Sequence, residues 1–333
     1  MSASSTPGPD RHLSSRQDTE RDRGRSATTP SDIPARGWKD ILLRVYKNIS
    51  RHHIIAIAAG ITFYTLLAIF PAIAALVALY GLFADPSTIA THLDKVGDIL
   101  PGGAIDIIRD QMTRVASQGS STLGLTFLGS LAVSLWSANA GIKSLFEALN
   151  IVYAEEEERG FIKLNAVSLA FTVTGICFAL IAIAAIVGLP IALQYVGLQN
   201  ATELLIKIGR WPLLLAVVIL ARAIVYRYGP SRDRAQWRWI TWGSAFAGLT
   251  WLIASGLFAW YAANIGTFNK TYGSLGAVIG FMTWIWISAI VVLLGAEVDA
   301  EMEHQTSSDT TEGKPQPMGA RRATMADTVG ARQ

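Results

Sequence analysis

The chain has 333 residues, of which 51% are apolar and only 16% are charged, and its formal net charge is +3. This composition is typical of a membrane protein and argues against a soluble globular domain. The basic residues gather at the ends of apolar segments and do not form a face that could bind nucleic acid. The single cysteine, Cys177, excludes an intrachain disulfide.

The two ends of the chain are polar. Residues 1–35 lack the apolar core of a signal peptide, and residues 304–333 have a similar polar composition. We therefore expect two disordered cytosolic tails around a membrane domain at 36–303. Within that domain, residues 38–51 carry an apolar stripe at helical spacing, with basic side chains mostly off the stripe. This pattern predicts an N-terminal amphipathic helix, which either lies on the membrane surface or packs against the bundle.

Six apolar segments are long enough to cross a bilayer as helices. The first, 55–83, contains no Asp, Glu, Lys or Arg. Pro71 lies within it and should kink the helix, because proline lacks a backbone N–H. The fold class is therefore an all-α, polytopic bundle of six transmembrane helices. The other five spans are expected at 122–145, 164–189, 204–228, 240–262 and 274–299.

The connections between spans indicate how the bundle is oriented. Basic residues concentrate before the first span and between the fourth and fifth spans. By the positive-inside rule, both termini are expected in the cytoplasm. The first connection, 84–121, carries two apolar stripes separated by Pro101-Gly102-Gly103. We expect it to form an external helical hairpin.

Polar side chains near the predicted cytoplasmic ends of three spans form a candidate cluster. Because polar groups within a span are costly, we expect Arg222 to pair with Glu297 or Glu147 at the mouth of a cavity. The alternative is structural: Lys143 and Glu147 form a simple i,i+4 pair, and Arg222 extends to the interface. The members of the candidate cluster are Asn139, Lys143, Glu147, Arg222 and Glu297.

A second candidate site lies in the glycine-rich segment before the sixth span. Its polar residues would line either a substrate path or a tight external turn. They are Asn264, Asn269, Lys270 and Tyr272. No residue spacing resembles a metal site or a phosphate-binding glycine loop, so we expect no cofactor and no enzyme activity.

Several blocks of sequence resemble the YihY/BrkB family of bacterial inner-membrane proteins. The resemblance covers about residues 38–303, and its blocks are AAGITFYTLLAIFP, SANAGIKSLFEALNIVY, YRYGPSR and NKTYGSLGAVIGFMTWIWISAIVVLLGAEVDAE. It implies a six-span protein of the bacterial plasma (inner) membrane with an envelope role in transport or lipid handling. Its implied partners are membrane lipids or a lipopolysaccharide-type substrate.

Two points qualify what the resemblance implies. Some family members have been labelled ribonucleases, but the short polar loops here lack a cationic groove and a placed acid and base, which argues against RNA cleavage and a nucleic-acid partner. The residues themselves also fit a non-transporting envelope scaffold, in which the polar groups lock helix packing. A lipid-accessible, water-filled groove between spans would favour lipid handling, whereas a dry, fully packed bundle would favour the scaffold.

Overall fold

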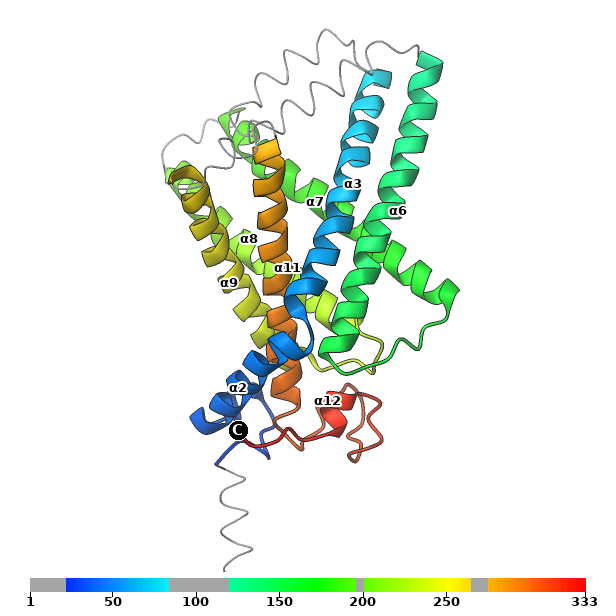
Figure 1. Cartoon of the computed structure of the whole chain (residues 1–333). Coiled ribbons are helices and arrows are strands. Elements are labelled where there is room, and N and C mark those ends of the chain that lie inside the picture. Colours follow the sequence, from blue (N-terminus) through cyan, green and yellow to red (C-terminus); the bar gives the residue numbers. More distant parts are fainter. Residues whose placement is uncertain (1–21, 84–119, 196–200, 265–274) are drawn as a thin grey trace, which may run out of the picture.

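The structure is a computed structural model that describes residues 22–83, 120–195, 201–264 and 275–333 (Figure 1). Its architecture is helical, and each of its six long helices overlaps one predicted span. These helices are α3 (Ile54–Phe83), α6 (Ser120–Val152), α7 (Phe161–Tyr195), α8 (Ala201–Tyr228), α9 (Trp237–Asn264) and α11 (Gly276–Glu303). The external hairpin expected at 84–121 lies almost entirely outside the described residues and stays a prediction.

Several of these helices are long and apolar enough to cross a membrane. Among the described residues, four segments meet both conditions: Gly124–Val152, Phe161–Phe178, Trp237–Asn264 and Val278–Glu303. A fifth is added if the bent pair formed by Ala35–Arg51 and Ile54–Ile69 counts as one span. Large apolar side chains such as Leu125, Trp136 and Leu257 point outward, as expected for helices surrounded by lipid. The membrane bundle is confirmed, and the count of six spans stays a prediction.

Helix α11 stands at the centre of the bundle (Figure 1). It packs against α9, α3 and α6, while α3 and α6 run side by side along their lengths and α8 packs on α9. Helix α7 contacts α6 and diverges from the other helices (Figure 1).

The expected N-terminal helix is α2 (Ala35–Arg51), which packs against α11. Ile41 and Val45 from its predicted apolar stripe are buried, but Arg44 and Asn48 are buried beside them. The contact favours packing on the bundle over a helix that only lies on the membrane. Helix α2 meets α3 at a bend of 61°. Helix α3 continues through Pro71 as one helix (Figure 1), and the kink expected at Pro71 stays a prediction.

Helices α9 and α11 approach closely at two glycines, Gly243 and Gly295. A Cβ atom on Gly295 would lie 2.5 Å from both Ala247 Cβ and Tyr226 Oη. Such distances are far inside van der Waals contact, so the crossing requires a residue without a side chain. Small residues serve this purpose in membrane helices, because they let two backbones come together.

Replacing Gly295 with valine should therefore force α9 and α11 apart. We expect the free energy of unfolding to fall by about 1–3 kcal/mol, the usual effect of overpacking. The measurement is thermal unfolding of the purified protein in detergent. Gly256→Val is the matched control, because nothing lies within 4 Å of a Cβ built on Gly256 of α9. Equal unfolding temperatures for the two variants would contradict the close contact.

The structure differs from the expected disorder of the two tails. Residues 22–34, with the short 3-10 helix η1 (Pro30–Asp32), and residues 304–333, with the helical turn α12 (Thr324–Asp327), pack at the same end of the bundle. We call residues 304–333 the C-terminal segment and this end of the bundle the terminal end. Residues 1–21 lie outside the described part of the chain.

Backbone hydrogen bonds hold the C-terminal segment to the loop between α8 and α9. Gln236 N donates to Thr310 O (2.9 Å), and Glu312 N donates to Arg234 O (2.8 Å). Polar composition suggested disorder because the segment has little apolar surface to bury. Its polar groups instead find partners on the bundle, which allows a polar segment to be ordered.

Arg321 is the main side-chain anchor within the C-terminal segment. It is 5% exposed, and its guanidinium donates to the carbonyl oxygens of Ser307, Ser308 and Ala326. Arg321→Gln should destabilise the segment by about 1–3 kcal/mol, because buried carbonyls lose their donors. Hydrogen–deuterium exchange over 304–333 should then accelerate. The exposed neighbour provides the control: Arg322→Gln should leave exchange unchanged, and equal exchange in both variants would contradict the anchoring role.

Candidate functional site

Four carboxylates near the end of α11 are buried. Their spacing of two residues places Glu297 and Glu301 on one helix face and Asp299 and Glu303 on another, because residues four apart share a face. All four are at most 3% exposed. Buried carboxylates need charged or hydrogen-bonding partners, and the two faces meet different ones.

The first face points toward α2. Glu297 Oε1 lies 2.5 Å from His52 Nδ1, at the α2–α3 junction. Glu301 forms an ion pair with Arg44. The side-chain amide of Asn48 joins the two carboxylates, donating to Glu297 Oε2 (3.3 Å) and Glu301 Oε1 (2.9 Å). The contacts fix α2 against α11.

The second face points toward α9 and the α8–α9 loop. Asp299 Oδ1 accepts the backbone N–H of Gly243 (2.7 Å), while its Oδ2 is buried and has no hydrogen-bond partner among the described residues. Glu303 pairs with Arg232 (2.6 Å), whose guanidinium lies over the ring of Tyr153 at 4.2 Å. The charged groups at this end therefore tie α11 to the loop as well as to α2.

The structure does not assemble the predicted cluster of five residues. Within the described part, no ion pair links Arg222 with Glu297 or Glu147. Arg222 lies over the Trp251 ring at 5.4 Å, and its buried Nη1 has no hydrogen-bond partner among those residues. Glu297 is paired with His52 instead. A cation within a bundle can be met by an aromatic face, which the spacing of charges could not predict.

The remaining members of the predicted cluster do not share partners. Lys143 Nζ donates to Asn165 Oδ1 of α7 at 2.5 Å, so the i,i+4 pair with Glu147 is replaced by a contact between helices. Glu147 is exposed, and the buried Asn139 Oδ1 has no partner among the described residues.

The predicted outer loop is described at one position only. Asn264 ends α9, and its amide donates to the carbonyl oxygen of Trp260 (2.8 Å). Asn269, Lys270 and Tyr272 lie outside the described residues, so the role proposed for them stays a prediction.

A pocket of about 1130 Å³ lies between α7 and α8 and extends to the terminal end. We call it the α7–α8 pocket. One part of its wall is apolar and comes from the two helices. That wall is formed by Val167, Ala170, Phe171, Gly175, Phe178, Val217, Leu220, Ala221, Ile224 and Val225. Leu220 and Phe178 are 54% and 40% exposed, so an apolar surface of the pocket is not covered by protein.

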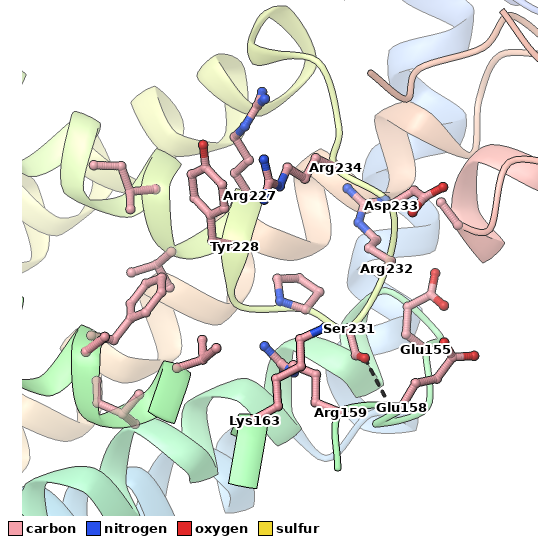
Figure 2. Close-up of a pocket in the computed structure, with 18 of the residues that line it drawn as sticks. Glu155, Glu158, Arg159, Lys163, Arg227, Tyr228, Ser231, Arg232, Asp233 and Arg234 are labelled. Atoms are coloured by element: carbon pink, nitrogen blue, oxygen red, sulfur yellow. Dashed lines mark hydrogen bonds between the residues drawn. The ribbon is translucent and has the colours of Figure 1, made fainter. Parts of the chain in front are cut away.

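The other part of the pocket is charged. Its residues come from the start of α7, the end of α8, the two adjoining loops and the C-terminal segment. They include Glu155, Glu158, Arg159, Lys163, Arg227, Arg232, Asp233, Arg234, Arg322 and Asp327. Figure 2 shows the loop through Ser231 crossing this end, with Arg227 and Arg234 above it and Arg159 and Lys163 below it. The Glu158 backbone N–H donates to Ser231 Oγ (3.1 Å), which joins the two loops.

Sequence reasoning missed this pocket although it used the same residues. The basic residues between the fourth and fifth spans, among them Arg227, Arg232 and Arg234, indicate orientation in the sequence, because basic residues commonly flank spans on the cytoplasmic side. The signal that could have found the site is that the start of the third span and the end of the fourth both carry basic residues, at the same end of the bundle. The composition of the C-terminal segment gave no indication that the segment contributes residues to the pocket.

Comparison with known proteins identifies the family. The sequence model of the family described as virulence factor BrkB matches residues 45–320, which is most of the chain. The chain belongs to the BrkB virulence factor family. The match confirms the resemblance, and it extends through much of the C-terminal segment.

Individual relatives of the BrkB chain are distant. A ribonuclease-like protein, YfkH, from Bacillus subtilis is 26% identical over 73% of this chain and 88% of its own length. A protein described as a UPF0761 membrane protein from Methylibium petroleiphilum is 22% identical over 84% of this chain and 66% of its own length. Another of that description, from Alkalilimnicola ehrlichii, is 26% identical, and the match spans 57% of its length.

The comparisons establish a membrane family and leave its activity open. The BrkB and UPF0761 descriptions name no enzyme activity, and the ribonuclease-like description belongs to a distant relative. No solved structure matches the chain.

Proposed function

We propose that the protein handles lipid in the plasma membrane of a bacterium, taking an amphiphile into the α7–α8 pocket and moving it between leaflets. The observation that carries the proposal is the division of the pocket into an apolar wall and a charged end. A membrane lipid has the same two parts. A volume of about 1130 Å³ is also slightly above the usual range for ligand pockets, which suits a bulky ligand.

The proposed topology places the two parts at matching depths. With both termini in the cytoplasm, the terminal end lies at the cytoplasmic surface, and the charged end of the pocket lies at headgroup level. The apolar wall on α7 and α8 then lies at the depth of the acyl chains. Exposed side chains such as Leu220 on this wall would face lipid rather than water.

The pocket favours lipid handling over the two alternatives. A scaffold needs packed helices, and the buried contacts of α11 would serve it, but a large pocket between two spans adds nothing to that role. RNA cleavage, suggested by the name of the Bacillus relative, would need a polar groove for the phosphate backbone. The apolar wall formed by α7 and α8 suits the hydrocarbon chain of a lipid instead.

Reconstitution into liposomes tests the proposal. The full chain is placed in vesicles that contain a trace of phospholipid with a fluorescent headgroup, and dithionite is added outside to quench the accessible label. Lipid exchange should bring quenching well beyond the half expected for sealed, protein-free vesicles. Quenching that stops at one half, with folded protein verified by circular dichroism, would overturn the proposal and leave the scaffold.

A further inference from the structure

We infer that Asp299 is a proton-binding site in the interior of the helix bundle, and that its carboxyl group is neutral at physiological pH. The site lies where α11 meets α9, because Asp299 Oδ1 accepts the backbone N–H of Gly243. The bound proton is independent of lipid handling in the α7–α8 pocket. Three observations at this crossing support it: the burial of Asp299, the balance of the charges around it, and the ligands that the site offers.

Asp299 is completely buried and has one hydrogen-bond partner among the described residues. Its side chain is 0% exposed, its Oδ1 accepts the Gly243 N–H at 2.7 Å, and its buried Oδ2 has no partner there. A single neutral N–H does not compensate a buried carboxylate. An ion without a counter-charge is so costly to remove from water that the group takes up a proton instead. The neutral acid leaves only one O–H group unpartnered, which costs far less.

The charges around Asp299 do not balance while its carboxyl group is ionised. In the described part of the chain, the ionisable side chains that interact electrostatically with it are Arg232, Glu303, Tyr153 and Tyr226. Arg232 is the cation of this set, and it already pairs with Glu303 at 2.6 Å. Two carboxylates therefore share one guanidinium, which leaves one negative charge. One proton restores neutrality, and Asp299 holds it because Asp299 lacks an ion pair.

The other buried cations near this end of α11 are engaged elsewhere. On the face toward α2, Arg44 pairs with Glu301, and His52 lies against Glu297. Arg222 of α8 lies over an aromatic ring of α9, and no ion pair links it to the site among the described residues. None of these side chains therefore supplies the missing positive charge.

The ligands at the site suit a proton better than a metal ion. Hard cations such as Ca²⁺ take six to eight oxygen ligands. In the ranges that the structure describes, no group of three or more His, Cys, Asp or Glu side chains could hold a metal ion. The carboxyl group is also pressed against α9, since a Cβ built on Gly243 would lie 2.4 Å from Asp299 Cγ. A proton needs neither further ligands nor further space.

The bound proton should favour the close packing of α9 on α11. Its loss would place an uncompensated charge at the crossing that Gly243 and Gly295 bring together. An aspartate in the unfolded chain is ionised at neutral pH, so folding takes up one proton at Asp299. Because the folded state then binds more protons than the unfolded state, this site lowers the stability of the protein as the pH rises.

Infrared spectroscopy of the full chain in detergent tests the site directly. Protonated and ionised carboxyl groups absorb at different frequencies, and ¹³C-labelling of aspartate carboxyls shifts the bands of aspartates alone. We expect a protonated-aspartate band in the labelled wild type at neutral pH and its loss in Asp299→Asn. The control is Glu156→Gln, an exposed carboxylate that should leave the band unchanged. Asp40, the other buried aspartate among the described residues, is neutralised by Arg23.

The labelled wild type is decisive even if the variant fails to fold. Absence of a protonated-aspartate band in that protein would overturn the inference, and so would a band that persists in Asp299→Asn. Thermal unfolding gives a second readout, because asparagine keeps an oxygen for the Gly243 N–H and stays neutral at every pH. The unfolding temperature of Asp299→Asn should rise relative to the wild type by about 2 °C for each pH unit near neutrality. A difference that does not change with pH would contradict the bound proton.

Discussion

Replacing Arg232 with methionine is expected to lower the free energy of unfolding by about 3–5 kcal/mol, the usual effect of breaking a buried ion pair. Arg232 and Glu303 have side chains that are 1% and 0% exposed, and their charged atoms lie 2.6 Å apart. Burial lowers the pKa of Arg232, but the charge and hydrogen bond of Glu303 raise it by more, so the net shift is upward. The substitution leaves Glu303 buried without its counter-charge.

Thermal unfolding in detergent measures this effect, and two further variants isolate its cause. Arg232→Met/Glu303→Leu removes both charges and should recover much of the loss, because no isolated charge remains buried. Arg238→Met removes an exposed arginine at the start of α9 and should unfold as the wild type does. An Arg232→Met protein as stable as the wild type would show that the pair does not hold the loop to α11.

Filling the α7–α8 pocket should prevent lipid binding. Gly175 lines the pocket on α7, and nothing lies within 4 Å of a Cβ built on it. A tryptophan there can enter the open space without displacing the helix. We expect the amount of phospholipid retained by the purified Gly175→Trp protein to fall about tenfold, which corresponds to about 1.4 kcal/mol. Native mass spectrometry measures the retained lipid.

A second glycine provides the matched control for this substitution. Gly129 on α6 also has nothing within 4 Å of a built Cβ, but it does not line the pocket. Gly129→Trp should retain lipid as the wild type does. A similar loss in both variants would mean that tryptophan on a lipid-facing helix is sufficient to remove lipid, and the pocket would not be its binding site.

Hydropathy predicted the helices well, because a helix that crosses a bilayer must be apolar over most of its length. The uninterrupted 55–83 segment corresponds to α3, and the charge-bearing end of the sixth span corresponds to the end of α11. The sequence predicted less well how each helix packs against its neighbours. Gly243 and Gly295 set the closest approach of α9 and α11, yet other glycines in the same helices, such as Gly256, face open space.

Partners of charged residues could not be predicted from depth alone. Arg222 and Glu297 share a predicted depth, but Arg222 meets the ring of Trp251 and Glu297 meets His52. Trp251 is one of five tryptophans in α9, and His52 is followed directly by a second histidine, so neither residue was marked out as a partner by its spacing. The C-terminal segment was missed for a related reason: its order depends on hydrogen bonds to the α8–α9 loop, and composition does not record them.

We propose that lipid crosses the membrane through the α7–α8 pocket. The most direct test compares the rate of leaflet exchange in proteoliposomes that contain the wild type, Gly175→Trp or Gly129→Trp at equal protein density. The pocket account predicts exchange in the wild type and in Gly129→Trp, and little or none in Gly175→Trp. Undiminished exchange in a folded Gly175→Trp protein would contradict it.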